Sequence, residues 1–267
     1  MLLDGVDQLI FNESDECMKI ILGLAYPEIF KVDTKNLCFY AAAYGYLDIL
    51  IWANADVQQK YNIPKSWRER NNYNFSWNCS ITVVAARYGH LDILIWTKDQ
   101  DYELVKNGFS VMSTAAKGDH FHVLKWLAEN GCQLFTCISE YAATNGNLEI
   151  LKWCEDNNKL LKDFCYNAAG SGHLEVLKWA KSRGYEHRAY YTAAYYGRLE
   201  VLDWAMLNND FDSDKIYFGA IQGNRLEVMG WAKANKLPLD LEICQFGHKV
   251  ESVDRWLSKN GCVCGKY

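Results

Sequence analysis

The stretch Ala168-Ala169-Gly170-Ser171-Gly172-His173-Leu174-Glu175-Val176-Leu177-Lys178-Trp179-Ala180 recurs, with substitutions, along most of this 267-residue sequence. Aligned on the tryptophan, its eight copies are centred on Trp52, Trp96, Trp126, Trp153, Trp179, Trp204, Trp231 and Trp256. Successive tryptophans are separated by 44, 30, 27, 26, 25, 27 and 25 residues. Repetition at a nearly fixed period predicts that the chain is built from one small structural element copied in series.

Two other columns of the alignment indicate what this element is. Eleven and ten residues before the tryptophan stand two alanines in six copies, with Ala220-Ile221 and Gln245-Phe246 in the last two. Seven residues before the tryptophan the copies have Gly45, Gly89, Asp119, Gly146, Gly172, Gly197, Asn224 and finally Lys249. Gly, Asp and Asn are the residues that best tolerate a positive φ, so the column predicts a left-handed residue that closes one helix before the next begins. Each copy is therefore expected to form a helix, a tight turn and a second helix.

The second helix of each copy is too apolar to lie on a surface. In the copy quoted above, only Glu175 and Lys178 interrupt the apolar side chains of the helix that carries Trp179. Such a helix packs on several sides, and a single copy cannot bury it, whereas stacked copies form one continuous core. We therefore expect an all-α fold. Within it, the small alanine pair allows close helix packing, and the repeat tryptophans, such as Trp126, Trp153 and Trp204, should be mostly buried.

The order Ala-Ala-x-x-Gly-His-Leu-Glu-Val-Leu-Lys resembles the ankyrin repeat, most closely at Gly89-His90 and Gly172-His173. The Thr-Pro-Leu-His opening of that repeat is absent, and the period is near 26 residues rather than the roughly 33 of ankyrin repeats. Shortened units that carry tryptophan are similar to the ankyrin-repeat proteins of large DNA viruses of amoebae. The resemblance covers about residues 37–261 and implies an ankyrin-like solenoid of about eight short helix-turn-helix repeats.

The segments outside the regular copies have their own interpretations. Residues 1–36 contain a stretch, 19–25, that aligns with residues 47–53, and we interpret them as a worn repeat that caps the array. A separate motif that recruits a ubiquitin ligase is the alternative for this segment. Residues 54–78 form an insertion between the first two copies, which is either a tolerated loop or a binding loop carrying Trp67 and Arg68. Residues 262–267 form a C-terminal tail.

The amino-acid composition of the chain disfavours several classes of function. The chain is 50% hydrophobic and 23% charged, with a formal net charge of −5, which disfavours general binding of nucleic acid or anionic membranes. The absence of a long apolar run and of a basic, then apolar, start predicts an intracellular, cytoplasmic protein (in the host cytoplasm if it is viral). Ten cysteines are then expected to be unpaired, and Cys262-Val263-Cys264 lacks the second pair of a zinc site. We expect neither metal nor other cofactors.

Nothing in the sequence predicts an active site. His90, His120 and His173 share the turn position after the glycine column, where other copies have Asn, Arg or Tyr, so a turn or cap hydrogen bond is the expected role. No nucleophile elbow, phosphate-binding glycine loop or two-histidine helix motif is present. The array is therefore predicted not to be an enzyme.

The function predicted instead is a scaffold or adaptor, monomeric, that binds an unidentified protein partner through its concave face and loops. A structural protein that self-associates is the alternative. Tyrosine is enriched at protein interfaces, and the helices of copies five to seven are rich in it. The candidate partner-binding residues are Tyr166, Tyr191, Tyr195, Tyr196, Tyr217, Trp67 and Arg68.

Overall fold

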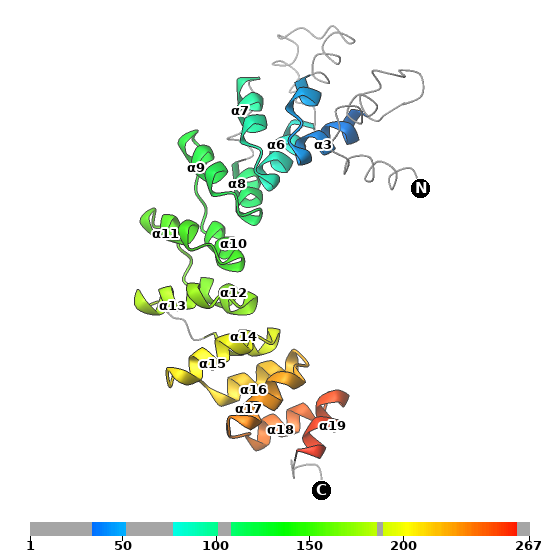
Figure 1. The fold of residues 1–267 in the computed structure, drawn as a ribbon, viewed down its shortest axis with the longest axis vertical. Helices are drawn as coiled ribbons and strands as arrows, with labels where there is room; N and C mark the ends of the chain where they lie inside the picture. Colours follow the sequence, from blue (N-terminus) through cyan, green and yellow to red (C-terminus); the bar gives the residue numbers. More distant parts are fainter. Residues whose placement is uncertain (1–33, 52–76, 101–107, 186–188, 261–267) are drawn as a thin grey trace. The chain divides into compact units, whose positions relative to one another are not determined.

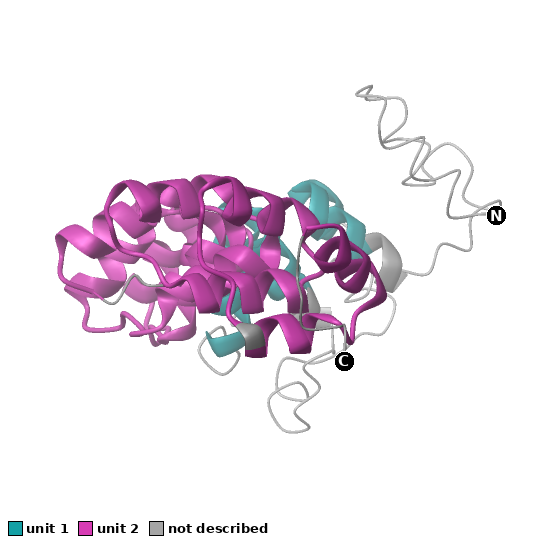
Figure 2. Cartoon of the chain, turned by 90° about the horizontal axis from the view of Figure 1, so that it is seen from below, with its two compact units in different colours: residues 1–114 teal, residues 115–267 magenta. Residues whose placement is uncertain are grey.

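The computed structural model describes residues 34–51, 77–100, 108–185 and 189–260. All regular secondary structure in these ranges is helical, which confirms the all-α prediction. The chain divides into two compact units, residues 1–114 and 115–267 (Figure 2). The boundary lies inside one helix of the third copy, where no feature of the repeat pattern marks it.

Unit 1 contains the helices of the first two copies and most of a further helix. They are α3 (Thr34–Tyr44), a helical stretch at residues 47–51, α6 (Trp77–Tyr88), α7 (Leu91–Asp99) and most of α8 (Gly108–Lys117). The helices α3 and α6, which carry the alanine pairs, pack against each other, and α6 also packs against α7. The predicted N-terminal cap and most of the insertion, with Trp67 and Arg68, lie outside the described residues.

Unit 2 continues the same helix pairs to the end of the chain (Figure 1). Its helices are α9 (Phe121–Glu129), α10 (Cys137–Asn145), α11 (Leu148–Asp156), α12 (Phe164–Ser171), α13 (Leu174–Ser182), α14 (Tyr190–Tyr196), α15 (Leu199–Leu207), α16 (Ser213–Gln222), α17 (Leu226–Ala234), α18 (Leu241–Gly247) and α19 (Glu251–Lys259). The first helices α10, α12, α14, α16 and α18 contact one another in series, and each also packs on the second helix of its own pair.

The turn between the two helices of a copy has the predicted conformation. Gly172 and Gly197 have φ of 89° and 75°, and Asp119 and Asn224 have φ of 64° and 52°. The left-handed residue reverses the chain within two residues, and the following amide then bonds back into the first helix, as in His173 N to Ala168 O at 2.9 Å. The positions of the helix boundaries in these copies are thereby confirmed.

A second left-handed column, which the sequence analysis missed, lies five residues after the tryptophan. Its members are Gly131, Asn158, Gly184, Asn209 and Lys236, with φ between 49° and 88°. In most copies an asparagine precedes it and donates its side-chain amide to the tryptophan carbonyl, as Asn157 does to Trp153 at 2.7 Å. These residues end the second helix, so the third to seventh copies each contain two left-handed helix ends rather than one.

The core consists of small and aliphatic side chains rather than tryptophans. The alanine pairs of the fourth, fifth and sixth copies are fully buried, together with pairs such as Val176-Leu177 on the second helices. The repeat tryptophans that the structure describes keep a minor part of their surface accessible, which confirms the prediction that Trp126, Trp153 and Trp204 are mostly buried. They lie along the edge between neighbouring second helices: Trp153 packs against Phe121, with ring centroids 5.5 Å apart. This position leaves part of each ring accessible.

The last copy is shifted by two residues from the predicted alignment. Ile243 and Cys244 are buried while Gln245 is exposed, so Gly247 and His248 take the places of the alanine pair, not Gln245 and Phe246. The connection between α18 and α19, residues 248–250, lacks the left-handed residue of the other copies.

Cys244 also corrects the prediction of unpaired cysteines, since it forms a disulfide. Burial raises the pKa of the Cys154 thiol to about 12.

Candidate protein-binding surface

Five aromatic side chains form a continuous series across three first helices of unit 2, and we call them the aromatic row. They are Tyr195, Tyr196 and Tyr191 of α14, Phe218 of α16 and Phe246 of α18. The ring centroids are 5.0 Å apart for Tyr195–Tyr196, 6.1 Å for Tyr191–Tyr195, 6.2 Å for Tyr191–Phe218 and 4.9 Å for Phe218–Phe246. The ammonium of Lys249 lies 5.6 Å from the Phe246 ring centroid and ends the series.

The sequence of α14 explains why its tyrosines face outward. Ala193 and Ala194 are fully buried and Tyr190 is 3% exposed, so these residues occupy the packed side of the helix. Tyr191 and Tyr195 are separated by one helical turn and are partly exposed, and Tyr196 follows at 48% exposed. The alanine pair thus fixes which tyrosines are left accessible.

Gly219 in α16 and Gly223, the residue that follows this helix, allow the aromatic side chains of neighbouring helices to lie close together. A Cβ atom at Gly219 would lie 2.3 Å from the carbonyl oxygen of Tyr191, and one at Gly223 would lie 2.1 Å from that of Tyr195. Only glycine allows so close an approach of two helix backbones. At this junction the Tyr191 hydroxyl donates a hydrogen bond of 2.6 Å to Oε1 of Gln222, which fixes that ring above α16.

The sequence-predicted site residues are only partly brought together. Tyr191, Tyr195 and Tyr196 belong to the aromatic row, and Tyr166 of α12 is 44% exposed nearby along the series of first helices. The prediction is wrong for Tyr217, which is 2% exposed. Its hydroxyl donates a hydrogen bond of 3.3 Å to the Leu237 carbonyl oxygen. Tyr217 and Tyr190 occupy the same column of the repeat alignment.

Phe246 is the member of the row that the sequence analysis did not predict. It was assigned to the alanine-pair column, which is a buried position, and the two-residue shift of the last copy moves it out of that column. The signal that could have revealed the shift is the missing Gly, Asp or Asn before Trp256, where the sequence has Lys249.

In the second, fifth and sixth copies the turn residue next to the left-handed column bonds to the preceding copy rather than capping its own helix. The ring Nε2 of His173 lies 2.7 Å from the Thr144 carbonyl oxygen, and Nε of Arg198 donates to Gly170 O at 2.7 Å. His90 in unit 1 makes the same contact with Ala43 O at 2.9 Å. Of the turn or cap hydrogen bond expected for His90 and His173, the cap form is absent, and each ring instead bonds from the turn to a main-chain oxygen of the preceding copy.

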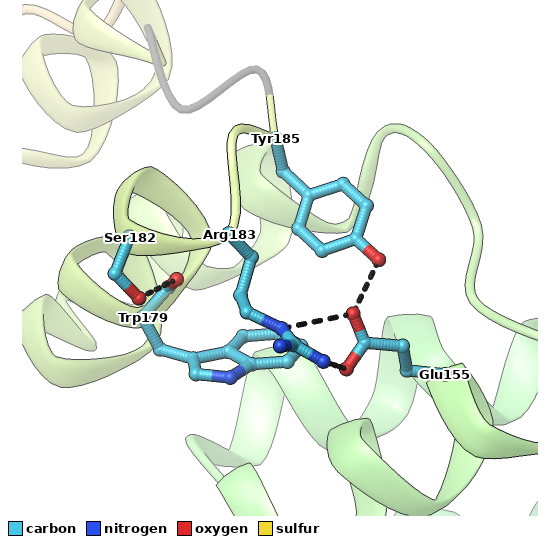
Figure 3. A network of polar contacts seen from close by, with 5 residues as sticks. All are labelled: Glu155, Trp179, Ser182, Arg183 and Tyr185. Atoms are coloured by element: carbon cyan, nitrogen blue, oxygen red, sulfur yellow. Dashed lines mark hydrogen bonds and ion pairs between the residues drawn. The ribbon is translucent and has the colours of Figure 1, made fainter.

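On the second-helix side, a carboxylate with three donors joins two copies (Figure 3). Glu155 accepts bonds of 3.2 and 2.7 Å from Nε and Nη2 of Arg183, and one of 2.6 Å from the Tyr185 hydroxyl. The Arg183 bonds, followed by the Tyr185 bond, hold the pKa of the Glu155 carboxyl below its ordinary 4.5. With both its oxygens occupied, this carboxylate is suited to joining segments and not to proton transfer.

The described residues offer no group of three or more His, Cys, Asp or Glu side chains placed to hold a metal ion. No helix in the same part of the chain is long and apolar enough to cross a membrane. Compared with known protein families and with curated proteins, the chain matches no family pattern and no relative.

Proposed function

We propose that this chain is an ankyrin-like helical-repeat protein that binds a protein partner through the first helices of its sixth to eighth copies. The aromatic row is the observation that carries the proposal. It joins five large rings on three helices of unit 2, and Tyr166 on the first helix α12 of the same unit is exposed as well. Tyrosine and phenylalanine supply large, rigid contact area, and the hydroxyl of tyrosine tolerates both water and a partner.

The alternative, self-association through the end of the array, has less support. The last described helix, α19, places Glu251, Arg255 and Lys259 on its exposed side while Val253 and Leu257 are buried. These charged side chains offer no apolar surface on which a second copy could stack. The role of an intracellular adaptor, of the type found in large DNA viruses of amoebae, remains part of the proposal, as does the absence of catalysis.

A capture experiment tests the proposal. The wild-type chain, the triple variant Tyr191→Ser, Tyr195→Ser, Tyr196→Ser and the control variant Leu207→Ser are immobilised and exposed to the same cell lysate. Leu207 is 85% exposed on α15, outside the row, so its replacement removes a similar apolar surface elsewhere. We expect proteins retained by the wild type and the control to be lost from the triple variant.

Equal retention by all three proteins would refute the proposal. Because Tyr191 and Tyr195 also pack between helices, circular dichroism and urea unfolding of the triple variant must accompany the capture. If that variant is unfolded, Tyr196→Ser alone replaces it, since Tyr196 is the most exposed ring of the row.

A further inference from the structure

Two guanidinium groups lie beside the aromatic row at equivalent positions of successive copies. Arg198 and Arg225 occupy the turn position of the sixth and seventh copies, 27 residues apart. Nε of Arg225 donates at 3.0 Å to the carbonyl oxygen of Tyr195, whose ring belongs to the row. Nε of Arg198 donates a hydrogen bond of 2.7 Å to Gly170 O. Gly170 lies under the Tyr196 ring, since a Cβ atom at Gly170 would be 3.0 Å from Cδ2 of Tyr196. Both guanidiniums are therefore held at known places along the row.

The guanidinium groups of Arg198 and Arg225 are held in place by carbonyl oxygens and not by carboxylates. Neither forms an ion pair with a carboxylate in the part of the chain that the structure describes, whereas Arg183 pairs with Glu155 and Arg255 with Glu251. A carbonyl oxygen that accepts from Nε leaves the guanidinium charge in place, and the Nη groups retain further donors. A fixed guanidinium of this kind suits a carboxylate that accepts two parallel hydrogen bonds.

The repeat spacing sets the separation of the carboxylates that could be bound. Neighbouring packed helices lie about 8–10 Å apart, so equivalent side chains of successive copies have a similar separation. An extended peptide rises about 3.1–3.4 Å per residue, and three residues therefore span about the same distance. A peptide with an acidic residue at every third position would meet one guanidinium per copy, while apolar residues between them contact the rings.

We propose that the aromatic row, with Arg198 and Arg225, binds an extended acidic peptide segment whose carboxylates are three residues apart and separated by apolar residues. The inference rests on the proposed function, because it uses the same surface. Single-stranded nucleic acid, which also combines negative charge with stacking groups, fits less well. Exposed Glu200 and Glu227 follow each arginine by two residues, so positive and negative charges alternate here and would repel a continuous polyanion.

Fluorescence anisotropy with defined probes tests this inference on the full chain. The main probe is a fluorescein-labelled peptide of glutamate-leucine-proline triplets. The comparison probes replace glutamate with lysine, lengthen the spacing to four residues with serine, or are labelled oligouridine. We expect the three-residue glutamate probe to bind at least tenfold more tightly than each comparison probe, and added salt to weaken its binding.

Variants then assign the binding to the two arginines. The double variant Arg198→Gln, Arg225→Gln keeps an amide donor for each carbonyl oxygen, and we expect it to bind the glutamate probe at least tenfold more weakly. Arg255→Gln is the matched control, because Arg255 is exposed on α19 and lies outside the row, and it should bind like the wild type. The charge-reversed variant Arg198→Glu, Arg225→Glu should prefer the lysine probe.

The contrary results distinguish failure of the acidic-peptide inference from failure of the proposed function. Equal binding of the glutamate and lysine probes, or unchanged binding by both arginine variants, overturns the acidic-peptide inference. Preference for oligouridine replaces it with nucleic-acid binding. If the serine variant of the three tyrosines still captures every protein that the wild type does, the proposed function itself fails, whatever the peptides do.

Discussion

Replacing Gly146 with alanine should weaken the contact between the fourth and fifth copies. Gly146 has φ of 78°, and a Cβ there would lie 2.5 Å from Nδ1 of His173, the ring that bonds to Thr144 O. The left-handed backbone alone costs an alanine about 1 kcal/mol. Displacing the imidazole forfeits its hydrogen bond, worth about 0.5–1.5 kcal/mol. We therefore expect Gly146→Ala to lower the free energy of unfolding by about 1.5–2.5 kcal/mol.

Gly184 provides the matched control for this prediction. Its φ is 77°, but a Cβ there would have nothing within 4 Å, so Gly184→Ala should cost only about 1 kcal/mol, the backbone contribution. Urea unfolding followed by circular dichroism measures both variants. In a background of His173→Ala, the cost of Gly146→Ala should fall to that of the control. Equal costs for the two glycines in the wild-type background would refute the role assigned to the histidine contact.

Three further predictions concern packing, pH and thiol reactivity. Gly219→Ala forces apart the backbones of α14 and α16 and should lower the stability by about 1–3 kcal/mol. Gly230→Ala lies in open space on α17 and should raise the stability by about 0.5–1 kcal/mol. Thermal unfolding of the two variants distinguishes these outcomes. The lowered pKa of Glu155 contributes stability that is present above its ordinary 4.5 and lost as pH falls through the folded value. The stability difference between the wild type and Glu155→Gln should therefore be largest near pH 7 and vanish in strong acid, and a constant difference in urea titrations would contradict this. Iodoacetamide at pH 8, read by peptide mass spectrometry, should modify the partly buried Cys137 well before Cys154, whose thiol burial keeps protonated.

The helices and their turns were predictable because the requirement behind them is local and recurs. Gly, Asp and Asn in one column meet the same demand for a positive φ in each copy, and Asp119 and Asn224 have it as expected. The second left-handed column was harder to recognise, since it mixes Gly, Asn and Lys236. A lysine in that position carries no sequence signal for a left-handed backbone.

The candidate surface was less predictable because it depends on contacts between copies. The alanine pair correctly places Tyr191, Tyr195 and Tyr196 on the accessible side of their helix. Tyr217 was wrongly predicted to be an accessible partner-binding residue. The equivalent residue of the neighbouring copy, Tyr190, is buried as well, so comparison of the two copies could have excluded Tyr217 from the site. The position of Phe246 was missed because the last copy departs from the repeat pattern, and Lys249 in place of Gly, Asp or Asn is the signal of that departure.

The hydrogen bonds that His90, His173, Arg198 and Arg225 make to the preceding copy have a consequence for how the chain can vary. Each of these bonds is accepted by a main-chain carbonyl oxygen, and the residues that supply it are as different as Ala43, Thr144, Gly170 and Tyr195. The bond therefore places no demand on the side chain at that position, which can change without loosening the junction. The main-chain oxygen of such a residue holds neighbouring copies together, whereas its side chain is available for recognition. Mutation can therefore change the surface while neighbouring copies stay joined.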